Sequence, residues 1–174
     1  MDKATRKGDG DLPAEILWLL EESYFGYVAT SDLNRVPHVT PVIFVYDGHN
    51  VFFSTSRVSK KIKNIRENER VAFLIDIRDP TDVSNNRAVL IQGRAKIIGL
   101  VRGLFQYHRL SRVRSMFSEK YPKYMEVYRV ENSRLPRNWR MTPFLSRLLV
   151  RIDMEKTLYW RGGRMVRLPK ASKG

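Results

Sequence analysis

The chain has 174 residues, and its 32 lysines and arginines against 18 acidic residues give a formal net charge of +14. It has no cysteine, and its three histidines, His38, His49 and His108, are too far apart for a local metal motif, so thiolate chemistry is excluded and metal chemistry is not expected. No apolar run is long enough to cross a bilayer, and the N-terminus lacks a secretory signal, so we expect a cytoplasmic protein without membrane association.

The length is typical of one domain that buries a core without cross-links. Residues 1–11 are polar and are expected to form a loose tail. The domain is expected over residues 12–168, with a helical excursion at 100–147, and residues 169–174 form a basic C-terminal tail.

The first elements predicted are a short helix and two strands. "LPAEILWLLEES" predicts an amphipathic helix over 13–24, with Pro13 in its first turn and Asp11 as a possible cap. "FGYVATS" (25–31) and "VPHVTPVIFVY" (36–46) are rich in β-formers and are separated by a polar turn, which indicates two antiparallel strands.

Two prolines limit how the second strand can pair with its neighbours. Pro37 and Pro41 lack the N–H group that a central ladder needs, so part of this strand is expected at an edge or bulge. The turn signal "DGHN" (47–50) then predicts a hairpin whose second strand is "VFFST".

The next segment predicts a short helix and two more strands. "SKKIKNIREN" has Ile62 and Ile65 three residues apart, which fits a helix capped by Ser59. "RVAFLIDIR" (70–78) and "RAVLIQGRAKIIG" (87–99) are the fourth and fifth strands.

Gly93 predicts a bulge or barrel corner in the fifth strand. Residues 100–129 are helix-like with a break near Pro122, and "RLLVRIDMEKTLYW" (147–160) returns to a strand. This order predicts a mainly β fold, a small antiparallel barrel with appended helices rather than a doubly wound sheet.

The third strand ends in hydroxyl residues, and the helix after it begins with lysines. Ser54, Thr55, Lys60 and Lys61 offer hydroxyls and ammonium groups beside a helix N-terminus, which are the donors that a phosphate requires. The alternative is that Lys60, Lys61 and Lys63 form the solvated face of a short helix, and composition alone leaves both interpretations open.

A longer pattern surrounds these residues. The segments "FGYVATS", "PHVTPVIFVYDGHNVFFSTSRVSKKIKNIRENERVAFLID" and "RAVLIQGRA" resemble the pyridoxamine 5′-phosphate oxidase-like family of flavin-binding split barrels. The resemblance implies a six-stranded antiparallel split barrel of the FMN-binding type. Its phosphate-side motif stands here as Phe53, Thr55, Ser59, Lys60, Lys61, Ile65 and Asn68.

The resemblance also implies a set of cofactor-binding residues. Hydroxyls at the end of the third strand would contact the flavin phosphate or ribityl chain, lysines would neutralise the phosphate, and "VTPV" would line the ring. A tryptophan near the C-terminus matches the flavin-side tryptophan. The implied cofactor-binding residues are Val39, Thr40, Pro41, Val42, Ser54, Thr55, Ser59, Lys60, Lys61 and Trp160.

The sequence departs from the oxidase that makes pyridoxal phosphate. That enzyme has an arginine near Val39 and a glutamine near Ala88, and this chain has neither. Its arginine-x-histidine element is also missing, because Arg167 is followed two residues later by Pro169. Pyridoxamine phosphate oxidase activity itself is therefore not expected.

The function implied is that of an FMN-binding oxidoreductase that transfers hydride or electrons to or from an unidentified small molecule. A homodimer with the cofactor at the subunit interface is implied as well. Two alternatives stay open: a reductase of the same fold that uses the deazaflavin coenzyme F-420, and a non-catalytic barrel that binds a ligand or nucleic acid.

No catalytic side chain is assigned, since a flavin supplies the redox chemistry itself. Asp76 and Asp79 could transfer protons and His38 could donate to a flavin, but strand-end carboxylates and a surface histidine are the simpler interpretation. A nucleic-acid partner is not expected, although the excursion contains a basic and aromatic cluster formed by Arg102, Phe105, Tyr107, His108, Arg109, Arg112, Arg114 and Phe117.

Overall fold

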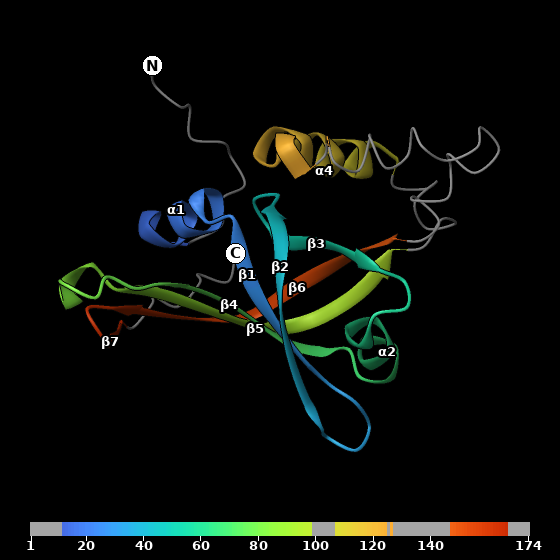
Figure 1. Cartoon of the computed structure of the whole chain (residues 1–174), viewed down its shortest axis with the longest axis horizontal. Helices are drawn as coiled ribbons and strands as arrows, with labels where there is room; N and C mark the ends of the chain where they lie inside the picture. Colours follow the sequence, from blue (N-terminus) through green and yellow to red (C-terminus); the bar gives the residue numbers. More distant parts are fainter. Residues whose placement is uncertain (1–11, 99–106, 125, 127–146, 167–174) are drawn as a thin grey trace, which may run out of the picture.

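The computed structural model describes residues 12–98, 107–124, 126 and 147–166 (Figure 1). Its strands form one antiparallel sheet in the order β3-β2-β1-β4-β5-β6-β7, and β3 also pairs with β6. The extra pairing closes the first six strands into a barrel. The predicted six-stranded antiparallel split barrel is thus confirmed, and the short β7 extends β6 as a hairpin.

The six barrel strands, α1 and α2 follow the predicted order, and their ends differ from the expectations by at most two residues. Neither η1 nor β7 was predicted. The strands are β1 Phe25–Ser31, β2 Pro37–Tyr46, β3 Asn50–Ser56, β4 Arg70–Ile77, β5 Arg87–Ile98, β6 Arg147–Arg161 and β7 Arg164–Val166. The helices are α1 Ala14–Glu22, α2 Lys60–Glu67, the 3₁₀ turn η1 Val83–Asn85 and α4 Tyr107–Lys120.

Helix α1 begins one residue later than expected. Pro13 precedes the helix instead of lying in its first turn, and its carbonyl accepts the N–H groups of Ile16 and Leu17. Asp11, the possible cap, lies outside the described residues. The helix buries its apolar face on the barrel through Ile16, Leu19 and Leu20.

The barrel interior holds one apolar cluster, and a second cluster lies beneath α4. Alternate strand residues point inward, as the period of two requires, and Phe44, Phe53 and Phe73 are fully buried. The second cluster consists of Ile43, Val45, Phe52, Val113, Phe117 and Tyr121. Figure 1 shows α4 over the β2–β3 hairpin, with α2 on another side of the barrel.

Strands β2 and β3 pair over only a short stretch. Residues 44–46 of β2 pair with 51–53 of β3, whereas residues 37–43 pair with β1 alone. All of β3 pairs with β6, and its end, residues 54–56, pairs with β6 alone. The predicted edge portion of the second strand is confirmed, and the divergence of β2 from β3 makes the split of the barrel.

Helix α4 is anchored at its C-terminal end, where the predicted break near Pro122 is found. The Tyr121 hydroxyl accepts the Phe44 N–H at 3.0 Å and lies 2.7 Å from the carbonyl oxygens of Tyr24 and Phe44, to one of which it donates. Residues 100–106, 125 and 127–146 of the predicted excursion lie outside the described residues.

Strand β5 bends at a bulge. The register with β6 shifts between Gln92 and Gly93, and a Cβ on Gly93 would lie 2.1 Å from the Asp153 carbonyl oxygen. A side chain at this position is therefore excluded by backbone, and the predicted bulge at Gly93 is confirmed.

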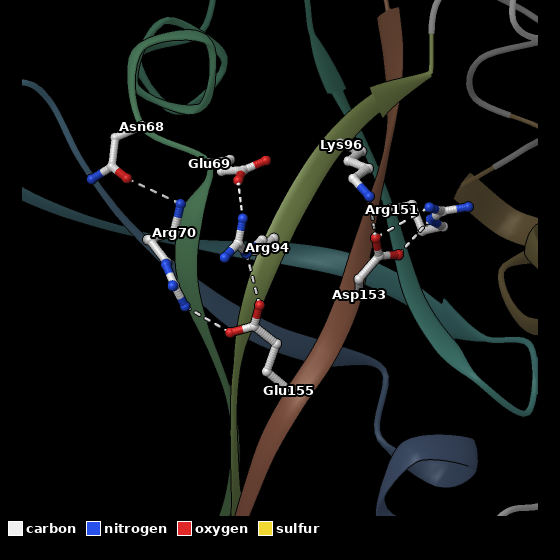
Figure 2. A network of polar contacts seen from close by, with 8 residues as sticks. All are labelled: Asn68, Glu69, Arg70, Arg94, Lys96, Arg151, Asp153 and Glu155. Carbon is white, nitrogen blue, oxygen red and sulfur yellow. Dashed lines mark hydrogen bonds and ion pairs between the residues drawn. The ribbon is translucent and has the colours of Figure 1, made fainter.

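Ion pairs tie three strands together around this bulge (Figure 2). Glu155 of β6 lies between Arg70 of β4 and Arg94 of β5, at 2.6 and 2.8 Å. Asp153 similarly pairs with Lys96 at 2.8 Å and with Arg151 at 2.6 Å. Part of the basic excess is thus neutralised in this network. No helix within the described residues is long and apolar enough to span a membrane.

Candidate functional site

A cavity of about 240 Å³ lies where β2 and β3 separate, and we call it the split cavity. Its lining brings together residues from both strands, from α2, and from segments far apart in the sequence. The lining residues are Phe25, Pro41, Val42, Ile43, Ser54, Thr55, Lys61, Tyr124 and Arg147. Five of the predicted cofactor-binding residues are among them: Pro41, Val42, Ser54, Thr55 and Lys61.

Thr55 connects the end of β3 to the start of α2. Its side chain is buried, its Oγ1 accepts a hydrogen bond from Lys61 Nζ at 3.1 Å, and it donates to Ser59 Oγ at 3.4 Å. Ser59 is the N-cap residue of α2, as predicted, but its side chain makes no capping hydrogen bond. The ammonium group of Lys61 is thereby held against the strand end.

Arg147 is a cavity residue that the sequence analysis did not identify. It is the first residue of β6 and pairs in register with Ser56. Its Nε lies 3.3 Å from Ser54 Oγ and its Nη2 lies 3.3 Å from the Ser54 carbonyl oxygen. The only sequence signal for Arg147 was its position as a basic residue at the start of the last predicted strand. That position points to the cavity only once the β3–β6 pairing is known.

The electrostatics of the split cavity suit an anion. Burial, followed by the positive charge of Arg147, lowers the pKa of Lys61 below its ordinary value. The described lining residues include two cations and three hydroxyls, those of Ser54, Thr55 and Tyr124, but no carboxylate. This set of donors fits a phosphate group, which binds through charge-assisted hydrogen bonds.

The other predicted residues lie outside this lining. Lys60 forms an ion pair with Asp32 at 3.1 Å, and Val39 is 60% exposed on the outer face of β2. Thr40 is half-buried with its hydroxyl 3.5 Å from the Pro41 carbonyl oxygen. Their roles, like that of Ser59, remain predictions from the resemblance.

Trp160 lies in a second cavity of about 260 Å³, which we call the tryptophan hollow. Asp76, Ala88 and Trp160 stand directly opposite one another on β4, β5 and β6. Asp76 also forms an ion pair with Arg78 at 2.8 Å. The residues that line the hollow are Leu74, Asp76, Arg78, Ala88, Trp160 and Gly163. Within a single chain, the predicted tryptophan therefore lies in a different cavity from Ser54, Thr55 and Lys61.

Asp79 organises a loop. Its carboxylate accepts hydrogen bonds from Thr81, Asp82 and Asn85, and these bonds hold the pKa of Asp79 far below its ordinary value. Such a carboxylate stays ionised and is a poor proton donor. His38 is half-exposed on β2 and lines neither cavity. Among the described residues, no group of histidine and acidic side chains is arranged to hold a metal.

Comparison with known proteins identifies the family. The family model described as pyridoxamine 5′-phosphate oxidase matches residues 12–160, which include all residues lining the split cavity and all those lining the tryptophan hollow except Gly163. The chain belongs to this family. Because the match includes β1 to β5 and nearly all of β6, the family assignment applies to the whole barrel.

Individual relatives agree with this assignment. The 5a,11a-dehydrotetracycline/5a,11a-dehydrooxytetracycline reductase of Streptomyces rimosus subsp. rimosus is 37% identical over 91 residues, which are 48% of this chain and 61% of the relative. The chain therefore spans about three fifths of that relative's length.

Solved structures share the fold at lower identity. A conserved hypothetical protein of Mycobacterium tuberculosis is 23% identical with a TM-score of 0.64, covering 98% of this chain and 100% of the other. An F420 reductase is 20% identical with a TM-score of 0.54, covering 84% of this chain and 98% of the other. The chain thus shares its fold with these two proteins.

Proposed function

We propose that the protein is an FMN-binding oxidoreductase that transfers hydride or electrons to or from a small molecule. The observation that carries the proposal is the split cavity, where two cations and three hydroxyls converge without a carboxylate among the described lining residues. Membership of the family suggests a flavin-type cofactor. The hydrogen-bond donors of the split cavity support a cofactor that carries a phosphate group.

Residues of this chain would bind the cofactor at its phosphate end and at its ring end. Ser54, Thr55 and Lys61 would bind the phosphate and the adjoining chain. Residues 39–42 of β2, which pair with β1 alone, would leave strand edge available to a ring, since Pro41 has no N–H to offer a ladder. The bound flavin would supply the electron chemistry, and the protein would supply orientation and electrostatics.

We also propose a homodimer, which the outer surface of the barrel supports. Five apolar residues on five neighbouring strands stand opposite one another in register: Pro41, Tyr27, Leu74, Leu90 and Leu158. None of them is buried, and Tyr27 is 44% exposed. A continuous apolar row of this kind indicates a surface that another protein covers.

A second copy of the chain is the occupant that completes the site. One end of the row, Pro41, lines the split cavity, while Leu74 lines the tryptophan hollow. A two-fold axis through the middle of the row, at Leu74, exchanges its two ends, so Pro41 beside each split cavity would face the partner's Leu158, which lies two residues from Trp160 along β6. Trp160 would thereby meet the cofactor bound by the partner.

The proposal is tested on the purified full chain. We expect a flavin absorbance spectrum, or its appearance when FMN is added, with FMN released on denaturation and identified by mass. Protein that stays colourless and binds no added FMN would overturn the proposal. A released deazaflavin would instead establish the coenzyme F-420 alternative, which the structural likeness to an F420 reductase favours at the level of the fold.

A further inference from the structure

The split cavity has an aromatic wall as well as a polar one. Phe25, the first residue of β1, and Tyr124, which follows α4, both line the cavity and are 48% and 44% exposed. We call these two rings the aromatic corner. We propose that the aromatic corner binds the substrate, and that this substrate is a planar, uncharged ring system. The inference rests on the proposed function and extends it to the substrate class.

The aromatic corner lies across the split from the hydroxyl residues of β3. Phe44 of β2 pairs with Phe53 of β3, and the pairing of these two strands stops there. The next residues, Ile43 and Ser54, both line the cavity instead. Phe25 pairs with Ile43 from the other side of β2. A phosphate held at the polar wall therefore leaves the aromatic corner free to contact another group.

Tyr121 positions both rings of the corner. Its hydroxyl lies 2.7 Å from the carbonyl oxygen of Tyr24, the residue before Phe25. Its buried ring meets Tyr124 edge to face, with the ring centres 6.1 Å apart. The corner is thus held by a buried residue and is formed without a ligand, as is usual for small-molecule sites.

The geometry of the corner suits a flat ring. The rings of Phe25 and Tyr124 lie 6.3 Å apart with their planes at 71°. Two rings at such an angle present a face and an edge to the same space, so a planar ligand can stack on one ring and meet the other edge-on. Covering exposed aromatic surface is favourable in water, and such a ligand would cover both rings together.

The surroundings of the corner favour an uncharged ligand. The neighbouring lining residues on β2 are Pro41, Val42 and Ile43, which are all apolar. The ring faces alone could attract a cation. However, the described lining residues include no carboxylate that would offset the lost hydration of a cation. A neutral ring loses little hydration there.

The test measures the binding of 2-naphthol, a planar uncharged probe, to the full chain with and without FMN, by calorimetry. Phe25→Ala and Tyr124→Ala are each expected to weaken binding roughly 5- to 20-fold, because each removes one ring of the corner. Tyr124→Phe keeps the ring and should bind as the wild type does. Trp18→Ala removes an exposed ring of α1 that does not line the cavity, and it is the matched control.

Two further probes test the chemistry of the ligand. 2-Decalol keeps the hydroxyl and both rings but is not planar, and 2-naphthylmethylammonium keeps the plane but adds a positive charge. Each is expected to bind roughly 10-fold more weakly than 2-naphthol. Equal affinity for 2-decalol would reveal a merely apolar surface, and equal affinity for the ammonium compound would show that cations are accepted. Either result overturns the assigned substrate class.

The outcomes separate this inference from the proposed function. If the chain binds FMN and FMN displaces 2-naphthol, the corner holds the cofactor ring, and the substrate inference fails while the proposed function stands. Unchanged affinity in both Phe25→Ala and Tyr124→Ala, or no binding to the wild type, also overturns the inference. If the chain binds no flavin, the proposed function fails, and 2-naphthol binding that depends on Phe25 and Tyr124 still supports the corner as a site for planar ligands.

Discussion

Two neighbouring lysines at the start of α2 lie in different surroundings. Lys60 is paired with Asp32, whose pKa is lowered by hydrogen bonds from the Val36 N–H and from Lys60. Lys61 lies against Thr55 in the split cavity and has a lowered pKa of its own. We therefore expect Lys61, but not Lys60, to contribute strongly to cofactor binding.

Replacing each lysine separately tests this difference. Lys61→Gln removes a charged hydrogen bond to the phosphate and is expected to weaken FMN binding by about 1.5–3 kcal/mol. Lys60→Gln breaks an exposed ion pair and should weaken it by less than about 1 kcal/mol. Titration of both purified variants with FMN measures the difference, and equal losses would show that Lys60 reaches the cofactor.

At the scale of elements, Lys120, the last residue of α4, helps Tyr121 to hold the helix against the barrel. Lys120 Nζ donates to the Leu20 carbonyl oxygen at 3.1 Å and lies 4.3 Å from the centre of the Phe44 ring. Burial lowers the pKa of Lys120 from 10.5 to about 8, although Glu22 and Glu21 oppose this shift. The helix is thus docked through a partly desolvated cation.

This docking predicts a pH dependence of stability. Between about pH 8 and pH 10.5 the unfolded chain keeps the proton on Lys120 while the folded chain loses it. The unfolded state then binds more protons, so this group makes the free energy of unfolding rise with pH across that window. Urea unfolding of wild type and Lys120→Met should show the wild type gaining stability relative to the variant; a constant difference would contradict the shift.

The bulge in β5 makes a second prediction at this scale. Gly93→Ala would place a methyl group 2.1 Å from the Asp153 carbonyl oxygen, and backbone must move to relieve it. We expect the free energy of unfolding to fall by about 1–3 kcal/mol, measured by urea denaturation. Gln92→Ala, at an exposed position beside it, is the control and should change stability little. A Gly93→Ala protein as stable as the wild type would show that the bulge can relax.

At the scale of the molecule, the apolar row couples assembly to cofactor binding in the proposed function. Tyr27→Glu places a charge in the middle of the row and is expected to yield a monomer that binds FMN more weakly. Light scattering after size exclusion, followed by FMN titration, measures both properties. Leu33→Glu, at an exposed position outside the row, should change neither. A Tyr27→Glu dimer with normal affinity would overturn the proposed interface.

Local patterns were sufficient for most of the elements. Alternating β-formers located the six barrel strands, Gly93 located the bulge, and the prolines of β2 located its edge portion, because each signal comes from the geometry of a short segment. The same locality explains why Ser54, Thr55 and Lys61 were found: they lie within one strand end and the next helical turn.

The sequence alone determined the order of the elements along the chain, the resemblance to a flavin-binding family and half of the candidate site. Only the tertiary structure added Arg147 to the cavity, paired Lys60 with Asp32, and separated Trp160 from the residues that line the split cavity. The physical reason is that these outcomes depend on pairings between distant strands and on competing charges, and the β3–β6 register that brings Arg147 beside Ser54 exists only in the closed barrel.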